Sequence, residues 1–361
     1  MTRISAAAAA ALFLTTTALS AGGLDRSGQP ISALFETGSY AELGFGLVQP
    51  SVSGTFTHPL AGELASGSVA NDYSQLTFAL KMDLNEQLSL ALILDQPYGA
   101  AVEYSQAGYP LNGTFADLRS QALTALLRYK INDRFSVHGG VRSVGMEADL
   151  QVSSPAGTYA AEFDNDRAIG YIVGAAYEIP DIALRVALTY SSETEFSNPT
   201  SVMGATGAWA PVANTEFVMP QQIALDFQTG IAANTLLMGQ IRWVEWTATE
   251  ISPQGYPGNP LVSYSDDRIT YTVGIGRKFS DSFSGAISVS YEEDQGNLVS
   301  NLSPTDGSLS IQIGGSYTMN NVELSGGIRY IMVGDATTET IGAEFADNSG
   351  LAIGMSVGYH F

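Results

Sequence analysis

The feature that most constrains this chain is a two-residue alternation of apolar with small or polar residues, which recurs from residue 40 to residue 361. Near the end of the chain the apolar set comprises Leu351, Ile353, Met355, Val357, Tyr359 and Phe361, and the other set comprises Ala352, Gly354, Ser356, Gly358 and His360. Successive side chains of a β-strand point to opposite faces, so each such segment is predicted to be a strand with one apolar face. The same division occurs in 222–231 and 308–317. The fold is therefore predicted to be all-β.

The alternation predicts about fourteen strands. They span residues 40–49, 73–83, 87–97, 117–130, 134–149, 168–178, 182–195, 221–231, 235–248, 268–279, 283–293, 307–318, 322–334 and 349–361. Short connections of Asn, Asp, Ser, Ala, Glu or Pro lie at residues 85–86, 132–133, 180–181, 233–234, 280–282 and 320–321. Long polar connections separate them. This regular exchange of short and long connections is typical of an antiparallel outer-membrane barrel with short periplasmic turns and long external loops.

A soluble β-sandwich and a β-helix are alternatives that periodicity alone leaves open. A sandwich would present Lys, Glu and Arg to water, whereas the second face here consists mainly of Gly, Ala and Ser. We therefore predict a transmembrane barrel over 40–361 whose small-residue face lines a lumen. Aromatic residues near the strand ends are predicted to form interfacial girdles; they are Tyr129, Phe135, Tyr177, Tyr190, Trp243, Trp246, Phe279, Phe283, Tyr291, Tyr330 and Tyr359.

The first 39 residues do not share the alternation. Residues 1–20 combine Arg3, an apolar run and small residues at the end, which predicts a cleaved signal peptide and export. The run from Ala6 to Leu14 is shorter than the roughly 20 residues of a spanning helix. Residues 21–39 are interpreted as an N-terminal segment that either hangs into the periplasm or folds into the lumen. We favour a hatch or plug in the lumen.

Composition argues against several other classes of protein. The chain has 36 Asp and Glu against 15 Lys and Arg, so binding to nucleic acid is not expected. It has no cysteine, which excludes disulfides and thiolate chemistry. His58, His138 and His360 lack metal-ligand spacing, and no serine has the context of a nucleophile elbow. We expect no enzyme activity, no cofactor and no metal centre. Acidic clusters at 164–166, 266–267 and 292–294 offer oxygen ligands for calcium or magnesium, but we favour solvated loop charge as their explanation.

Several segments resemble the FadL/TodX-type family of outer-membrane transporters for long-chain fatty acids and other hydrophobic compounds. The similar segments are Ala91–Gly99 followed by Tyr104, Leu123–Arg142, Pro220–Trp246, Asp266–Tyr291 and Ser303–Gly307. Together they cover nearly the whole barrel. The sequence departs from the family at the hatch, where residues 35–42 contain no Asn-Pro-Ala motif.

The resemblance implies passive uptake of a hydrophobic small molecule, released through a gap in the wall. Pro97, Tyr98 and Gly99 are the expected gap, because proline removes a ladder donor; a plain strand end is the alternative. The implied partners are this ligand, outer-membrane lipid and lipopolysaccharide, and the barrel-assembly machinery, which would read Phe361. The alternatives are a general diffusion porin or structural barrel, and an outer-membrane lipase that would use His138.

Three groups of residues are predicted to contact the ligand. The first is apolar and lies in the N-terminal segment: Ile31, Leu34 and Phe35. The second is Arg142, Arg242 and Arg329, because a guanidinium can bind a carboxylate through two parallel hydrogen bonds; pairing with Asp226 or Glu323 is the alternative. The third is Trp209 and Phe217 in the long connection 196–220, which either capture the ligand or pack loop against loop.

Overall fold

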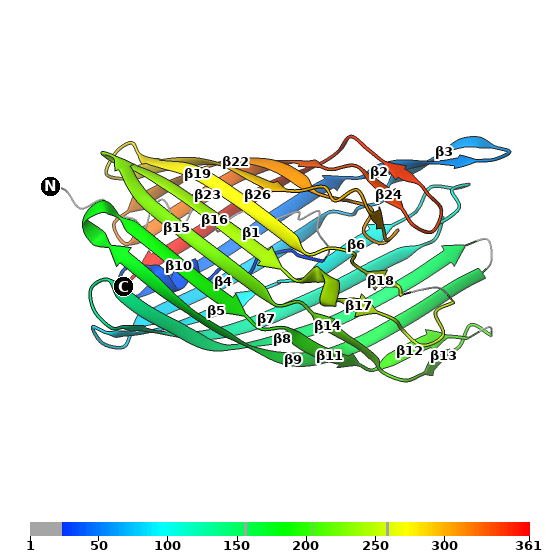
Figure 1. Cartoon of the computed structure of the whole chain (residues 1–361), viewed down its shortest axis with the longest axis horizontal. Helices are drawn as coiled ribbons and strands as arrows, with labels where there is room; N and C mark the ends of the chain where they lie inside the picture. Colours follow the sequence, from blue (N-terminus) through cyan, green and yellow to red (C-terminus); the bar gives the residue numbers. More distant parts are fainter. Residues whose placement is uncertain (1–23, 155–156, 205, 258–259) are drawn as a thin grey trace.

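The computed structural model describes residues 24–154, 157–204, 206–257 and 260–361. The predicted signal peptide and its cleavage site lie outside these residues. In the described chain, fourteen strands form the wall of a closed antiparallel barrel (Figure 1). They are β1 (Tyr40–Ser51), β4 (Tyr73–Asp83), β5 (Leu88–Asp95) continued by β6 (Gly99–Glu103), β7 (Phe115–Lys130), β8 (Phe135–Ser154), β9 (Gly157–Ile179), β10 (Leu184–Ser191), β15 (Gln222–Ala232), β16 (Thr235–Val244), β19 (Arg268–Lys278), β20 (Phe283–Glu292), β22 (Ser308–Met319), β23 (Val322–Val333) and β26 (Asn348–His360).

The barrel closes between its first and last strands. β1 pairs with β26 in antiparallel register from Tyr40 opposite His360 to Ser51 opposite Ser349, and β1 also pairs with β4. Pairing of β1 with β26 removes the two outer edges of the sheet, which is what a sheet needs in a solvent without hydrogen-bonding groups. The predicted barrel is confirmed, and most strands agree with the predicted ranges to within a few residues. The predicted strands 134–149 and 168–178 are longer than expected, because β8 continues to Ser154 and β9 begins at Gly157.

The barrel carries its apolar side chains on the outside. On β22, Ile311 and Ile313 are exposed, whereas Ser310 and Gln312 are buried on the lumen side. β26 repeats the pattern, with Met355 60% exposed and Ser356 5% exposed. This arrangement is the reverse of a soluble protein, and it suits a wall that faces lipid. In the described part of the chain, no helix is long and apolar enough to cross a membrane.

The predicted short turns are present, and their Asn residues shape them. The Asn85 and Asn132 side chains each accept hydrogen bonds from backbone amides two and three residues later, at 2.9 Å. Asn234 and Asn320 adopt the left-handed conformation, with φ of 57° and 55°. Asn tolerates this region better than most residues, so these turns are encoded locally.

Two strands end earlier than predicted, because the chain leaves the barrel wall there. The predicted strand 182–195 ends at Ser191, and the chain then turns into a separate hairpin of β11 (Thr194–Asn198) and β14 (Thr215–Met219). β16 ends at Val244 instead of residue 248, and the 3-10 turn η4 (Trp246–Ala248) follows. Trp246 is therefore not a girdle residue: it is buried inside the barrel at 1% exposure. Alternation is a local signal and does not reveal where a chain leaves the wall.

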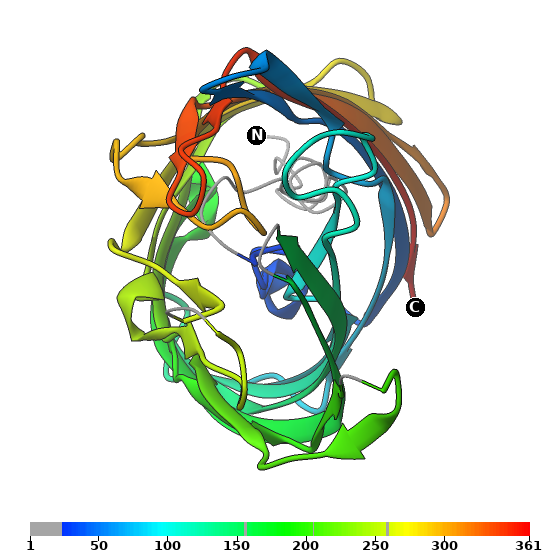
Figure 2. The same ribbon diagram turned by 90° about the vertical axis from the view of Figure 1, so that its right-hand side faces the viewer.

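The N-terminal segment, residues 24–39, lies inside the ring of strands, as the view along the barrel shows (Figure 2). Its short 3-10 helix η2 (Ser32–Phe35) packs on the inner wall. There Ile31, Ala33 and Leu34 form an apolar cluster with residues of the wall strands: Ala79, Ala91, Ile93, Leu126 and Ile172. Burial of these apolar side chains positions the segment in the lumen.

Candidate transport site at an opening in the wall

The wall is interrupted beside the bend between β5 and β6. The β4–β5 ladder ends at Phe78 opposite Leu94, and the described part of β4 above this pair, 73–77, forms no ladder with β6. The two sides of the wall pair again at an isolated antiparallel bridge between Ala70, which precedes β4, and Val102 of β6. We call the interval between these two pairs the wall window. It lies next to Pro97, Tyr98 and Gly99, and their role as a lateral gap for a ligand stays a prediction.

The N-terminal segment lies on the inner side of the wall window and pairs there through an isolated β-bridge. Asp25 forms an antiparallel bridge with Tyr98, flanked by hydrogen bonds from the Arg26 amide to the Pro97 carbonyl and from the Gly99 amide to the Leu24 carbonyl, both 2.8 Å. The segment thus satisfies backbone groups that β4 leaves unpaired at the bend.

Arg26 joins the segment to both sides of the wall window. Its guanidinium donates a hydrogen bond of 3.0 Å to the Gly99 carbonyl and lies 3.3 Å from the centroid of the Tyr73 ring on β4. A Cβ at Gly99 would lie 3.0 Å from Arg26 Nε and 3.2 Å from the Leu118 carbonyl oxygen, so a larger residue would have to displace the Arg26 side chain slightly. We call the lumen side of the wall window the inner mouth. Side-chain contacts, and not continuous strand pairing, hold its two sides together.

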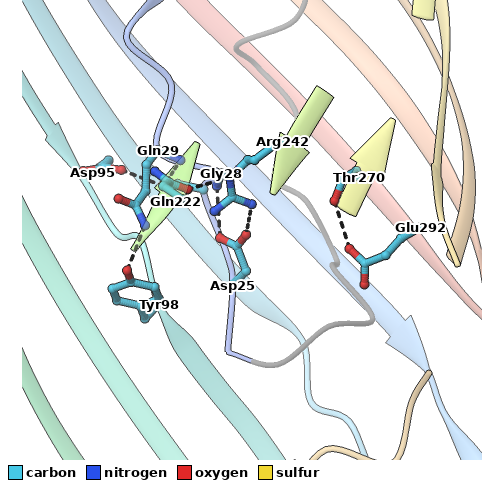
Figure 3. A network of polar contacts seen from close by, with 10 residues as sticks. Asp25, Gly28, Gln29, Asp95, Tyr98, Gln222, Arg242, Thr270 and Glu292 are labelled. Atoms are coloured by element: carbon cyan, nitrogen blue, oxygen red, sulfur yellow. Dashed lines mark hydrogen bonds and ion pairs between the residues drawn. The ribbon is translucent and has the colours of Figure 1, made fainter. Parts of the chain in front are cut away.

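A buried polar network anchors the segment (Figure 3). Arg242 on β16 forms an ion pair with Asp25 and donates a hydrogen bond of 2.6 Å to Gln222. Gln29 donates to the Tyr98 hydroxyl at 2.9 Å, and the Ser27 hydroxyl donates to Asp95 at 2.6 Å. Both side chains of the Arg242–Asp25 pair are more than nine-tenths buried, and removing one partner of such a pair typically costs about 3–5 kcal/mol.

Three neighbouring cavities share Ala100 of β6. The largest, about 640 Å³, lies at the wall window and is lined by Arg26, Tyr73, Gln96 and the outward-facing Phe115 and Arg119. A second cavity of about 80 Å³ lies at the inner mouth. The third, about 40 Å³, lies deeper and is mainly apolar; its lining includes Leu24, Leu118, Leu150, Phe163, Ile251, Leu261, Val262, Tyr264 and Leu302. We call it the inner cavity. Leu24 borders the second and third cavities and Arg26 borders the first and second, so the N-terminal segment lines part of all three.

An apolar cluster near the inner cavity includes the β11–β14 hairpin. Phe196 and Phe217 stack at 5.3 Å between ring centroids and are buried with Met219. The same cluster contains Tyr98 and Trp246, whose rings meet edge to face at 6.4 Å. The hairpin therefore packs inside the barrel mouth instead of standing in solvent.

The predicted ligand residues occupy different environments. Leu34 is fully buried against the wall, and Ile31 and Phe35 border a separate cavity of about 70 Å³ next to β10 and β15. Phe35 lies between the guanidiniums of Arg128 and Arg185, at 4.7 and 4.6 Å. Phe217 packs loop against loop, whereas Trp209, on β13 (Trp209–Pro211), is exposed. Contact of these residues with a ligand stays a prediction.

The three lumen arginines are not equivalent. Arg242 binds a carboxylate of its own chain, and that carboxylate is Asp25 and not Asp226 or Glu323. Arg142 lies within electrostatic range of Asp25 and Asp95 and donates a hydrogen bond of 2.8 Å to Thr124. Arg329 donates to Gln312. The structure therefore brings Arg142 and Arg242 together at the N-terminal segment.

Acidic loop residues mainly bind the loops themselves. Asp166 accepts the Ser197 amide at 2.8 Å, and Asp267 accepts the Thr247 hydroxyl at 2.6 Å. Asp306 binds Arg268 at 2.7 Å. Within the described ranges, no three His, Cys, Asp or Glu side chains converge as a metal site would require.

Sequence reasoning missed the residues that connect the segment to the wall window. Asp25 and Arg26 are adjacent charged residues in an otherwise mostly small and apolar leader, and charges that enter a lumen need partners. That signal was available. No comparable signal marked Tyr264 or the inward position of Trp246, because both depend on the path of long connections.

A closed antiparallel barrel with an apolar outer belt is the fold of an outer-membrane β-barrel protein. The family model for outer membrane protein transport proteins (OMPP1/FadL/TodX) matches residues 31–298. The chain belongs to this family, which is one of transport proteins and not of enzymes, and its location is the outer membrane. No match was found among curated proteins.

Solved structures share the fold at low sequence identity. A Pseudomonas aeruginosa FadL homologue is 15% identical, with a TM-score of 0.74, covering 100% of this chain and 98% of the homologue. The Pseudomonas putida toluene transporter TodX is 14% identical, with a TM-score of 0.66 and coverage of 100% and 98%. The Ralstonia pickettii toluene transporter TbuX is 13% identical, with a TM-score of 0.65 and coverage of 91% of each chain.

Proposed function

We propose that this protein is a passive channel for hydrophobic small molecules, which occupy the inner cavity and leave through the wall window. The single observation that carries the proposal is the isolated β-bridge of the N-terminal segment at the bend, where Leu24 lines the inner cavity and Arg26 lines the cavity of the wall window. In this proposal, displacement of Leu24–Arg26 opens a path between the cavities that these residues line. Lateral release suits such permeants, since each buried methylene contributes about 0.8 kcal/mol that a water-filled pore would forfeit.

The lining of the inner cavity favours neutral permeants over fatty-acid carboxylates. No Lys, Arg or His is among its described lining residues. Asp117 and Asp149 border it, and both interact with Arg119 on the outer face of the wall. Arg268, which lies close to Tyr264, is paired with Asp306. A carboxylate would lose its hydration there without gaining a cation. Both toluene transporters with this fold are consistent with a neutral permeant.

The test is a reversible lock on the wall window. Asp25 and Tyr98 form a non-hydrogen-bonded antiparallel pair, whose Cα atoms are typically about 4.5 Å apart, within disulfide range. The wild-type chain has no cysteine. In the Asp25→Cys/Tyr98→Cys variant, uptake of radiolabelled toluene by intact cells should stop on oxidation and recover on reduction.

The matched control is Ser290→Cys/Ser310→Cys, a facing pair on β20 and β22 away from the wall window. Oxidation of this pair should leave uptake unchanged. Uptake that continues through the locked Asp25–Tyr98 variant would refute lateral release. Swelling of liposomes in sugar solutions would instead support the diffusion porin.

Capture by Trp209, contact with lipopolysaccharide and recognition of Phe361 by the assembly machinery belong to the same proposal. Trp209 lies at the exposed tip of the β12–β13 hairpin, where β12 (Thr200–Met203) pairs with β13 and Met203 is exposed beside it. Two large apolar side chains at a loop tip support first contact with a hydrophobic molecule.

A further inference from the structure

One side chain that lines the inner cavity, Tyr264, carries a buried hydroxyl with no hydrogen-bond partner among the described residues. Tyr264 follows the short strand β18 (Val262–Ser263), and its ring packs against Trp246 at 5.0 Å between centroids. The hydroxyl oxygen is buried and has no partner among the described residues. A buried polar group left unsatisfied is destabilising, and such groups are uncommon. The phenol stays protonated, because burial raises its pKa above the ordinary value.

Other buried tyrosines in the barrel mouth show how such hydroxyls are usually satisfied. The Tyr159 hydroxyl donates to the Gln254 carbonyl at 3.1 Å, and the Tyr104 hydroxyl donates to the Asn301 carbonyl at 2.7 Å. The Tyr98 hydroxyl accepts a hydrogen bond from Gln29. Tyr109 also lacks a partner, but it stacks on Tyr104 in the outer loops and does not line the inner cavity. Tyr264 differs from all four because its unpartnered hydroxyl belongs to a side chain that lines an apolar cavity.

We propose that Tyr264 determines specificity by hydrogen-bonding one neutral polar atom of an otherwise apolar permeant. This inference rests on the proposed function and names its substrate class: small aromatic or aliphatic molecules with a single hydroxyl or carbonyl group. A site that offers an unmet hydrogen bond discriminates against an analogue that cannot make it, because the protein group then stays unpaired. An apolar lining without a cation disfavours the charged form of the same molecule.

The experiment compares two ligands that differ by one hydroxyl, p-cresol and toluene. Binding of each radiolabelled ligand to the purified full chain in nanodiscs is measured against empty nanodiscs. The wild type should prefer p-cresol beyond the ratio set by partition into the lipid. Tyr264→Phe should lower p-cresol binding about tenfold, the effect of one hydrogen bond, and leave toluene binding unchanged.

Tyr159→Phe is the matched control, since it removes a buried hydroxyl that already has a protein partner. It should leave the ligand ratio unchanged. A wild type without preference for p-cresol, or a Tyr264→Phe variant that loses both ligands equally, would overturn the proposal. The wild-type measurement needs no variant to fold. If the wild type binds neither ligand, the proposed function is contradicted as well. Measuring acetophenone and ethylbenzene in the same way repeats the comparison for a carbonyl group.

Discussion

At the scale of single residues, charge inside the barrel is concentrated where the N-terminal segment meets the wall. Arg242 binds Asp25, and Arg128 on β7 binds Glu178. Phe35 lies between Arg128 and Arg185, so the segment also contributes a ring to the neighbouring cations. A buried charge is tolerated only when it has a partner, and the N-terminal segment supplies Asp25 and the Phe35 ring as partners for these arginines.

Glu36 makes docking of this segment dependent on pH. It directly follows η2 and is buried; burial and then the carboxylate of Glu323 raise its pKa to about 8. Glu42 acts in the same direction, whereas Arg185 and Lys81 oppose it. Because the pKa is higher in the docked state, docking is most favourable below the ordinary carboxyl pKa of 4.5 and weakens as the pH rises through about 8.

We expect a nitroxide label on Thr37→Cys, an exposed position beside Glu36, to become more mobile between pH 6 and pH 9. Glu36→Gln should remove this change. Glu63→Gln, which alters charge equally on an exposed external strand, should preserve it. Identical pH profiles for wild type and Glu36→Gln, measured by electron paramagnetic resonance, would contradict the assignment.

At the scale of elements, the β11–β14 hairpin is held by side-chain packing more than by wall pairing. Its two strands form a separate two-stranded sheet, and an isolated hairpin is only marginally stable. The stacked rings of Phe196 and Phe217 join it to the apolar cluster inside the barrel mouth.

Phe196→Ala should release this hairpin while the barrel stays folded. Loss of a buried phenylalanine costs about 3–5 kcal/mol, more than such a hairpin can absorb. Amide hydrogen exchange in β11 and β14 should increase strongly, whereas exchange in β22 and β23 stays slow. Trp209→Ala, at an exposed aromatic in the same connection, should change little. Slow exchange of the hairpin in Phe196→Ala would show that another contact holds it.

At the scale of the whole molecule, the exposed apolar belt determines which solvent the barrel requires. Ile313 is 61% exposed on the outer face of β22, at a height between Tyr330 of β23 and Tyr317 of β22. Met319 is 57% exposed on the same face, at the periplasmic turn. Because the two side chains are similarly exposed but lie at different depths in the membrane, a difference between their substitutions reports on lipid and not on packing within the protein.

Ile313→Lys should lower the free energy of unfolding in vesicles by roughly 2–4 kcal/mol, while Met319→Lys should lower it by no more than about 1 kcal/mol. A lysine in the belt loses its hydration, whereas one at the turn reaches water. Denaturant titration followed by tryptophan fluorescence measures both. Equal effects of the two substitutions would argue against a lipid-facing belt at this height.

The sequence by itself determined the strands, their turns and the face that meets lipid. These features are local: alternation in 308–317 assigns each side chain to a face, and Asn132 shapes its turn with amides two and three residues away. Pro97 and Gly99 are likewise a local signal, since proline removes a ladder donor at the point where β5 ends and β6 begins.

Only the tertiary structure decided what meets at the site. Asp25 and Arg242 are 217 positions apart. The β-bridge between Asp25 and Tyr98 at the wall window comes from a segment with no alternation. Trp246 turns inward, and Tyr264 borders the inner cavity, because of the path taken by long connections. Periodicity describes each strand alone, whereas these contacts depend on barrel closure and on the burial of apolar groups far apart in the chain.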